Sequence, residues 1–434
     1  MSTNDRSLTS ALAAATCALL GTSNASAADG ESARWSFDSA LLYYGESDDR
    51  VQDLSAALSA TRDFDDDRKL GLSLTVDTLT GASASGAIAL DGPQTFTSPS
   101  GNKTYTTPAA KVPLDDTFLD TRYAASVSWT QPLARLYSFS VGAGFSTEYD
   151  YTHLGANFSL ARDFNKRNTT LFAGVAWSQD DIDPVGGAPI ALSQMLDVGD
   201  SSHKAGSGSK DVLDLLVGVT QVLGRSTVLR VNYSLSDSTG YLNDPYKILS
   251  LVDPSTGDTI ARAPPTGAGP TGFYIYEGRP DTRLKHSVFT ELKHAFGSPV
   301  LHVAYRFMAD DWGIDSHTMD ARLRWPIATA YFVEPQLRYY TQGEADFYHA
   351  SLRADEPLPT YASADFRLGS FAAMTVGLRV GGATSGGGEW STRLEYYMQS
   401  GEVPAGQIIG NQARREQYPD LSAVIVQFGY RFKM

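Results

Sequence analysis

The chain has 434 residues, of which 42% are hydrophobic, and its formal net charge at pH 7 is −14. The negative charge argues against nucleic acid as a partner, because proteins bind phosphate backbones with basic surfaces. A single cysteine excludes a disulfide scaffold. Tyrosine (22), phenylalanine (19) and glycine (39) are abundant and long amphipathic helical stripes do not occur, so the composition favours an all-β protein.

The N-terminus has the pattern of a secretory signal peptide. Residues 8–21 are mostly apolar but too short to span a bilayer as a helix, and Ala25-Ser26-Ala27 is a small-x-small cleavage site. We therefore predict a cleaved signal peptide at 1–27 and a single mature domain at 28–434. Cys17 would leave with the signal peptide, so no thiol would remain for a metal site or a nucleophile. Lipid attachment at Cys17 is a less favoured alternative.

Segments in which apolar residues alternate with small or polar ones recur along the mature chain. In 70–76, for example, Leu70, Leu72 and Leu74 alternate with glycine and serine. Each segment is near the roughly 9–11 residues with which a tilted strand crosses a bilayer. We therefore predict about sixteen antiparallel transmembrane strands. They are 35–44, 54–60, 70–76, 122–130, 137–145, 152–162, 169–179, 210–222, 226–237, 283–295, 299–309, 316–325, 329–341, 364–382, 389–399 and 421–433.

The predicted connections separate by length. Short ones with turn residues are 62–68, 131–135, 162–168, 222–226, 296–299 and 325–328. Long ones, rich in Pro, Gly, Ser, Thr and Asp, fall between them at 80–118, 180–209, 238–282, 342–363 and 400–420. Short periplasmic turns and long extracellular loops are typical of outer-membrane barrels, whereas a soluble sandwich has no reason to segregate its loops by length. The sequence thus predicts an all-β, transmembrane antiparallel up-and-down β-barrel in the outer membrane.

Three tyrosine pairs indicate the direction of the strands. Tyr43-Tyr44, Tyr339-Tyr340 and Tyr396-Tyr397 fall where strands meet long loops, and tyrosine favours the membrane interface. With these ends outward, both termini lie in the periplasm. Segment 361–382 is long enough for two strands, but splitting it would give an odd number and place the C-terminus outside. We therefore expect one long strand there.

Two short motifs and the last strand resemble a known family. The motifs are Tyr43-Tyr44 followed by Glu46-Ser47 and Asp49-Arg50-Val51, and the sequence DTLTGAS at 77–83. The last strand, 421–433, is amphipathic and aromatic, as is the strand that the barrel insertion machinery recognises. In these features the chain is similar to a Gram-negative outer-membrane barrel family known only as a domain of unknown function. The resemblance implies an envelope location and a barrel fold, but no activity and no functional residue.

If the apolar alternates face lipid, the other alternates face the lumen. In the N-terminal strands these positions are mostly small, which would widen the lumen or leave room for loop 80–118 to fold inward. In the later strands the inward positions are charged, which permits two interpretations. The charges form a basic strip that favours anionic solutes, or they pair across strands and only hydrate the lumen. The predicted pore-lining residues are Arg283, Lys285, Glu291, Lys293, His302, Arg306, Asp320, Arg322, Arg324, Glu334, Arg338, Arg379, Arg393, Glu395 and Arg431.

These features predict a porin-like outer-membrane channel or transporter for small hydrophilic solutes, with anions favoured by the first interpretation. The alternative is a structural barrel that sheathes a periplasmic or extracellular partner. A hydrolase is less favoured because a GxSxG motif is missing, and we expect no catalytic activity.

We expect no cofactor and no metal centre, since neither HExxH nor a histidine cluster at ligand spacing occurs. The predicted surroundings are outer-membrane lipid and lipopolysaccharide. Acidic residues of the outer loops either bind divalent ions that bridge to lipopolysaccharide or are simply solvated, which is the favoured interpretation. They are Glu46, Asp48, Asp49, Asp180, Asp181, Asp183, Asp310, Asp311 and Asp315.

Overall fold

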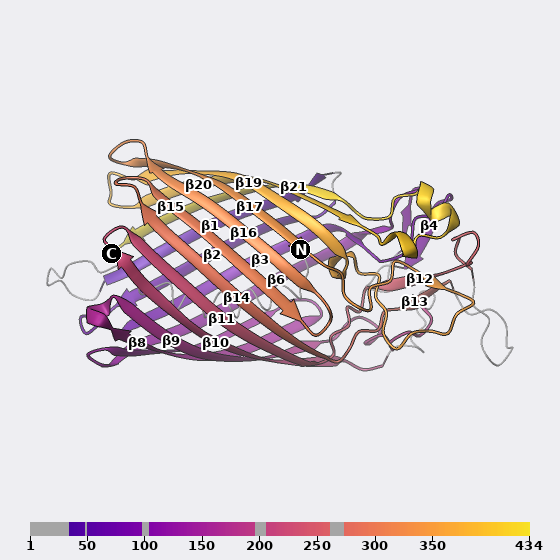
Figure 1. The fold of residues 1–434 in the computed structure, drawn as a ribbon, viewed down its shortest axis with the longest axis horizontal. Coiled ribbons are helices and arrows are strands. Elements are labelled where there is room, and N and C mark those ends of the chain that lie inside the picture. Colours follow the sequence, from indigo (N-terminus) through magenta and orange to yellow (C-terminus); the bar gives the residue numbers. More distant parts are fainter. Residues whose placement is uncertain (1–33, 48–49, 98–103, 196–204, 261–272) are drawn as a thin grey trace.

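The computed structural model describes residues 34–47, 50–97, 104–195, 205–260 and 273–434. The predicted signal peptide at 1–27 and the acidic residues Asp48 and Asp49 lie outside these ranges. Sixteen strands form one closed antiparallel barrel (Figure 1). Each strand predicted from the alternation coincides with one of them, so the predicted fold and strand number are confirmed. The barrel strands are β1 (Arg34–Glu46), β2 (Gln52–Asp63), β3 (Lys69–Ala84), β6 (Leu114–Ala134), β7 (Tyr137–Thr147), β8 (Tyr151–Phe164), β9 (Thr169–Ile182), β10 (Gly208–Gly224), β11 (Thr227–Gly240), β14 (Thr282–Ala295), β15 (Val300–Asp310), β16 (Asp315–Pro326), β17 (Tyr331–Gln342), β19 (Ser370–Ala383), β20 (Glu389–Glu402) and β21 (Leu421–Lys433).

The barrel closes where the last strand pairs with the first. Phe432 of β21 lies opposite Phe37 of β1, and their rings stack with centroids 5.1 Å apart. Trp35 and Met434 exchange backbone hydrogen bonds of 2.9 and 2.8 Å. The start of β1 and the C-terminus therefore lie side by side at the same end of the barrel.

The long connections all leave the opposite end, on the right-hand side of Figure 1. They are 85–113, 183–207, 241–281, 343–369 and 403–420. We call this end the outer end and the other the periplasmic end. Every connection at the periplasmic end is short, and the outer end also has three short ones, 47–51, 148–150 and 311–314. The predicted segregation of loops by length is thus confirmed.

Segment 361–382 contains one strand, as predicted, but the strand begins only at Ser370. The preceding residues belong to loop 343–369. There the Asp365 side chain accepts a hydrogen bond from the Arg367 amide and caps a short 3-10 helix, η3 (Phe366–Leu368). The predicted start of this strand was therefore too early, because side-chain capping favours a turn over an extended chain at this point.

One face of the barrel is an exposed apolar band. Leu41, Leu54 and Leu74 are 56%, 61% and 58% exposed, and large apolar side chains are exposed at alternate positions around the barrel. An apolar surface of this extent is stable only against hydrocarbon, so this face is the outer, lipid-facing one. No helix in the described ranges has the length and apolar character needed to span a membrane.

The tyrosine pairs divide between the two faces of the barrel. Tyr43, Tyr339 and Tyr396 are exposed on the outer face. Their neighbours point inward, and each donates a hydrogen bond to the side chain two residues further on. The bonds run from Tyr44 to Glu46 at 2.8 Å, from Tyr340 to Gln342 at 2.6 Å and from Tyr397 to Gln399 at 2.6 Å. Only one tyrosine of each pair therefore holds the interface position that the sequence suggested for both.

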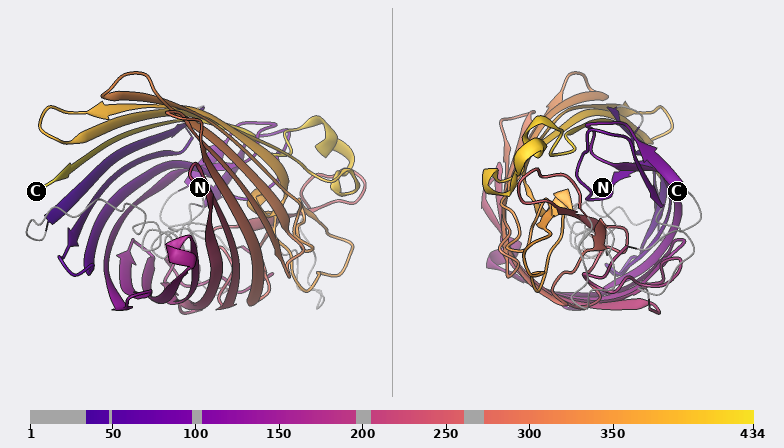
Figure 2. Two further views of the ribbon diagram at one scale, coloured as in Figure 1. Left: turned by 60° about the vertical axis from the view of Figure 1, so that its left-hand side comes forward. Right: turned by 90° about the vertical axis from the view of Figure 1, so that its right-hand side faces the viewer.

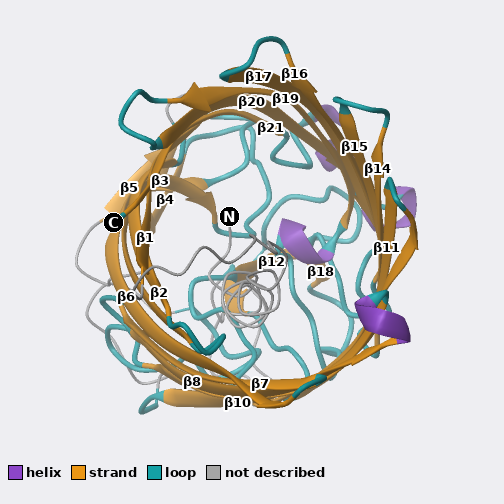
Figure 3. Ribbon diagram, turned by 90° about the vertical axis from the view of Figure 1, so that its left-hand side faces the viewer, coloured by secondary structure: helices purple, strands orange, loops and turns teal. Residues whose placement is uncertain are grey.

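The long loops fold into a body at the outer end that we call the cap. It contains a sheet in the order β13 (Tyr274–Tyr276), β12 (Ile248–Val252), β18 (Leu352–Arg353) and a hairpin of β4 (Gln94–Thr97) and β5 (Thr104–Thr107). Short helices η4 (Ala405–Gln407) and η5 (Gly410–Arg414) complete it. The cap lies beyond the strand ends in Figure 1 and within the outline of the barrel in Figures 2 and 3. It therefore stands across the outer mouth.

The cap has an apolar core built from several loops. One buried cluster joins Leu249 and Leu251 of loop 241–281 to Leu352 of loop 343–369. Another joins Phe96 of loop 85–113 to Tyr276. Loop 85–113 thus packs on the cap sheet. The sequence predicted these loops but not their shared core.

Candidate functional site: the lumen wall and the cap

The predicted pore-lining residues all lie on the face opposite the apolar band. Register places them side by side across neighbouring strands: Lys293 lies opposite His302, and His302 lies opposite Arg322. On β19 and β20, Arg379 lies opposite Arg393. Basic residues outnumber acidic ones in this set, so β14 to β21 form a predominantly basic wall.

Three arginines of this wall are tightly neutralised. Arg283 binds Asp310 at 2.5 Å, Arg322 binds Asp320 at 2.7 Å, and Arg431 binds Asp38 of β1. Lys285 lies opposite Asp310 in the register. The pairs of Arg283 and Arg431 cross strands, as in the second interpretation, whereas Arg322 and Asp320 lie on the same strand, β16.

Other cations of the wall have only distant carboxylates. Glu291 is shared by Lys293 at 3.6 Å, His302 at 3.6 Å and Arg230 at 3.9 Å. Arg379 is 3.8 Å from Glu334, and Arg393 is 3.8 Å from Glu395. Charge-assisted bonds are typically about 2.7–2.9 Å long, so these contacts are weak.

The sequence analysis missed Arg230 because its strand was classed with the small-residue half. The parity of β11, however, already places Arg230 on the inward face.

For three arginines of this wall no carboxylate among the described residues lies within 4.0 Å: Arg306, Arg324 and Arg338. Asp320 lies opposite Arg338 in the register, but its carboxylate binds Arg322 and Gln336 instead. The guanidinium carbons of Arg306 and Arg324 lie 5.6 and 3.6 Å from the ring centroids of Phe289 and Phe332. The wall therefore keeps a positive excess after all pairs have formed.

The wall on β6 to β9 carries small inward side chains, such as Ser126, Gly144 and Gly174, as predicted. A buried charged group interrupts it near the outer end. Asp180 forms an ion pair with Lys210 at 2.7 Å and contacts His153 Nδ1 at 2.6 Å. The sequence analysis placed Asp180 in an outer loop, which is wrong: it lies in β9 and its charge is used within the wall.

The acidic residues of the outer loops do not converge on an ion site in the described structure. Asp310, assigned to a loop, ends β15 and binds Arg283. Within the described ranges, no group of three or more His, Asp or Glu side chains is arranged to hold a metal ion.

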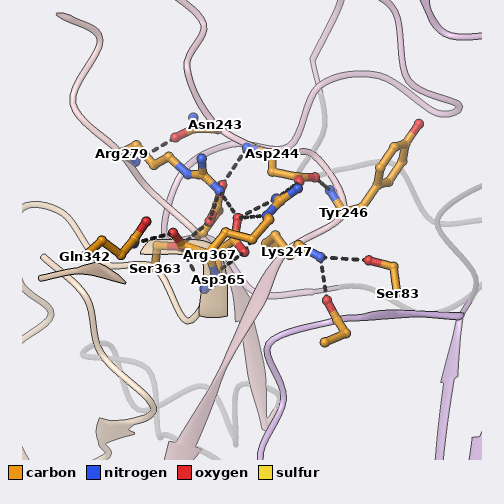
Figure 4. Close-up of polar contacts among 12 residues, drawn as sticks. Ser83, Asn243, Asp244, Tyr246, Lys247, Arg279, Gln342, Ser363, Asp365 and Arg367 are labelled. Carbon is orange, nitrogen blue, oxygen red and sulfur yellow. Dashed lines mark hydrogen bonds and ion pairs between the residues drawn. The ribbon is translucent and has the colours of Figure 1, made fainter. Parts of the chain in front are cut away.

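The cap contains a second set of charges where loops 241–281 and 343–369 meet (Figure 4). Buried Arg279 binds Glu277 at 2.7 Å and Asp365 at 2.8 Å. Arg367 binds Asp365 at 2.7 Å and Asp244 at 2.5 Å. We call these residues, together with Lys247, the cap network. In contrast to Arg306, Arg324 and Arg338 of the lumen wall, its guanidinium groups are held by close carboxylates.

Lys247 ties the cap network to the barrel. Its Nζ donates to the Ser83 hydroxyl at 3.2 Å and to the carbonyl oxygen of Ala84 at the end of β3 (Figure 4). Next to it, the amide of Ile248 donates to the Ser85 carbonyl at 2.9 Å. The first strand of the cap sheet is thereby fixed to the outer end of a barrel strand.

Burial and neighbouring charges shift the pKa values of the cap network. Burial raises the pKa of the Glu277 carboxyl, and burial together with Arg367 lowers the pKa of the Lys247 ammonium. Burial alone would also raise the pKa of Asp365, but the charges of Arg367, Lys247 and Arg279 hold it well below its usual range. Asp365 is therefore the anion that the surrounding cations stabilise.

Further ion pairs connect the remaining loops. Arg415 of loop 403–420 binds Asp91 at 2.8 Å and Asp258 at 2.5 Å, which joins three loops at one guanidinium. Arg50 of loop 47–51 donates to the carbonyl of Asp420 at 2.9 Å. The cap is consequently cross-linked in several places.

The two motifs of the family resemblance meet at the outer ends of β1, β2 and β3. Arg50 lies 3.4 Å from Glu46, which also accepts from Tyr44. Gly81 of the second motif has φ 127°, and a Cβ at this position would lie 1.9 Å from the Arg50 carbonyl oxygen. Only glycine fits there. Both motifs therefore have a shared structural role, and Asp49 lies outside the described residues.

The family can now be stated. A family model described as "Protein of unknown function (DUF3570)" matches residues 9–432. The chain belongs to this family. The resemblance inferred from the motifs is confirmed, and the family match and the closed barrel agree on an outer-membrane β-barrel fold. No protein with a curated description matches the sequence.

Solved structures with similar folds are distant. The siderophore receptor PirA from Acinetobacter baumannii matches with a TM-score of 0.42 and 9% identity over 86% of this chain and 54% of that one. A bacterial polysaccharide outer membrane secretin matches with a TM-score of 0.43 and 9% identity over 94% of this chain and 100% of the secretin. The outer membrane protein opdK from Pseudomonas aeruginosa matches with a TM-score of 0.37 and 9% identity over 93% of this chain and 99% of opdK. The chain spans about half the length of the receptor. At these scores none of the three supports an argument about the function of the chain.

Proposed function

We propose that the chain is an outer-membrane channel or transporter for small hydrophilic solutes, that it favours anions, and that it is not an enzyme. The observation that carries the proposal is the positive excess of the inward wall. Arg306, Arg324 and Arg338 have no carboxylate within 4.0 Å among the described residues, and Arg379 and Arg393 have only distant ones.

The size of the barrel supports an aqueous lumen. Barrels of about 16–18 strands leave a water-filled channel, whereas about eight strands are filled by their own side chains. A low-dielectric wall around such a channel focuses the field of its charges and raises the local concentration of counter-ions. A wall with unneutralised arginines would therefore draw anions inward.

The cap is the outer barrier in this proposal. It stands across the mouth, and its loops are joined by buried ion pairs, so a solute must pass between them or displace part of the cap (Figures 2 and 3). A barrel that sheathed a long partner would need a mouth free of such a body. The cap therefore favours transport of small solutes over the sheath alternative.

Liposome swelling tests this function. Purified protein in liposomes should admit small solutes, and a small organic anion should enter faster than a neutral solute of equal size. Reversing the charge of Arg322 and Arg324 together should remove or invert this preference. Equal entry of anionic and neutral solutes would refute the anion bias, and no entry of any small solute would refute the channel.

A further inference from the structure

One part of the basic wall brings like charges into direct opposition. Arg379 of β19 lies opposite Arg393 of β20, and Glu334 lies opposite Arg379 on the other side. Like charges that face each other across a strand pair are destabilising. Each of the two arginines has only one distant carboxylate: Glu334 lies 3.8 Å from Arg379, and Glu395 lies 3.8 Å from Arg393.

A third arginine joins this pair through an aromatic ring. The guanidinium carbons of Arg324 and Arg379 lie 3.6 and 5.5 Å from the centroid of the same Phe332 ring. The two guanidinium carbons are therefore no farther from each other than the sum of their distances to the ring. We call Arg324, Arg379 and Arg393 the arginine cluster. It lies near the periplasmic ends of β16, β19 and β20.

The cluster retains hydrogen-bonding capacity. Arg379 donates one bond from Nη2 to the Ser391 hydroxyl at 3.1 Å. Nε of Arg393 is buried and has no hydrogen-bond partner among the described residues. A buried donor without an acceptor costs free energy, so an oxygen ligand that reached it would be stabilised.

The wall beside the cluster is made of small residues. Gly381, Ser391 and Gly429 lie opposite one another on three successive strands. The Phe332 ring lies over Gly381, where a Cβ would come within 2.7 Å of it. The remaining Ser391 and Gly429 carry little bulk beside the guanidinium groups.

From this arrangement we infer that the arginine cluster is a binding site for a small oxyanion, a carboxylate or a phosphate. The inference deepens the proposed function and rests on it for the route by which the anion arrives. Guanidinium groups bind these anions through paired, parallel N–H···O bonds. The bound anion would also relieve the repulsion between Arg379 and Arg393.

Three other arginines of the wall are already neutralised. Arg283, Arg322 and Arg431 are each held by a close carboxylate. Arg338 has no carboxylate within 4.0 Å among the described residues, but it lies opposite Asp320, not opposite another arginine. It supplies a matched control, because its removal lowers the charge of the wall without touching the cluster.

The test is a calorimetric titration of the full barrel in detergent micelles with sodium phosphate and, separately, with sodium succinate at constant chloride. The wild type should bind at least one of them saturably, and the tighter of the two identifies the ligand class. Arg379→Gln with Arg393→Gln should weaken binding at least tenfold. Arg379→Lys with Arg393→Lys should also weaken it, because lysine keeps the charge but loses the planar pair of donors. Arg338→Gln should leave the affinity within twofold.

Three results would overturn the inference: no saturable binding of either anion by the wild type, equal weakening by Arg338→Gln, or unchanged affinity in the lysine variant. Conductance measured in parallel separates the two proposals. An anion-selective barrel that binds neither probe would keep the proposed function and lose the site. A barrel that binds but does not conduct would keep the site and lose the function.

Discussion

The lumen wall and the cap are built from the same charged residue types, yet they pair them differently. In the cap network, Arg279 and Arg367 contact carboxylates at 2.5–2.8 Å. In the wall, Arg379 and Arg393 contact theirs at 3.8 Å, and Arg324 has none within 4.0 Å among the described residues. The same kinds of side chain therefore hold loops together in one region and remain available to solutes in the other.

Access to water accounts for this difference. A charge removed from water is tolerated only when partners replace its hydration, so the cap network must be closely paired. A charge on the wall of a wide lumen keeps its water and needs no close partner. Pairing distance thus separates the cap network from the arginine cluster.

The largest expected effect follows from removing the central anion of the cap network. Asp365→Asn leaves the buried guanidinium of Arg279 with one carboxylate and weakens the hold on Arg367. We expect the local stability of the cap to fall by about 3 kcal/mol, since breaking a buried pair leaves an uncompensated charge. Denaturant-dependent hydrogen exchange of loop 343–369 measures this, and ion conductance should rise as the cap loosens.

Asp355→Asn is the control on the same loop. Its partner Arg353 is exposed, and exposed pairs contribute little. If Asp365→Asn and Asp355→Asn increased the hydrogen-exchange rates of loop 343–369 equally, burial would not determine which ion pairs stabilise the cap.

The next effect is a pH dependence at the rim beside the cap. Burial, with the nearby carboxylates of Asp120 and others, raises the pKa of Glu148 and of Asp150 to about 7. Between the unfolded value of about 4 and 7, the folded rim binds more protons than the unfolded chain. The free energy of unfolding contributed by these groups is therefore largest below about pH 4 and falls as the pH rises to 7.

Thermal unfolding in micelles at about pH 5 and about pH 8 checks this sign. The wild type should lose more stability over that interval than Glu148→Gln with Asp150→Asn, in which both carboxyl groups are replaced by neutral amides. A double variant as pH-dependent as the wild type would show that other groups control the rim.

A smaller effect on stability is expected from the arginine cluster. Arg379→Gln with Arg393→Gln should change the free energy of unfolding by less than about 0.5 kcal/mol, because the ion pairs that these two side chains form are long and weak. A slight gain is the favoured direction, since opposed like charges are removed. Denaturant unfolding measures it, and a decrease as large as that of Asp365→Asn would mean that the wall arginines are structural after all.

The smallest effect concerns an exposed pair within the cap. Lys111 lies 3.3 Å from Glu416, and its side chain is largely exposed. We expect Lys111→Gln to change the free energy of local opening of loop 85–113, measured by hydrogen exchange, by no more than about 0.5 kcal/mol. A larger change would show that proximity, and not burial, determines which cap pairs matter.

The barrel could be predicted from the sequence because residues that face lipid alternate along each strand with residues that face the lumen. Val424, Val426 and Phe428 face lipid while Gln427 and Arg431 face inward, and this parity is visible without any structure. It also placed every predicted pore-lining residue on the inward face. The distances within the wall could not be predicted, because they depend on register and on side-chain conformation. The opposition of Arg379 and Arg393 appears only once β19 and β20 are aligned.

The cap could not be predicted because its contacts join distant parts of the chain. Arg415 binds Asp91 across 324 residues, and no local pattern encodes that pairing. One signal was present: 248–252 is a short, mostly apolar run inside a loop, interrupted only by Ser250, and such a run is typical of a buried strand. The start of β19 was misplaced for a different, local reason, because the bond between Asp365 and the Arg367 amide competes with an extended chain.

The central claim is that the inward wall forms an aqueous path whose arginines favour anions. The reversal potential of single channels in planar bilayers under a potassium chloride gradient tests it most directly. The wild type, or Asp365→Asn if the cap keeps the barrel closed, should show anion preference, and Arg379→Gln with Arg393→Gln should move the potential toward that of an unselective pore. A cation-selective potential, or a barrel that stays non-conducting with the cap loosened, would contradict the claim.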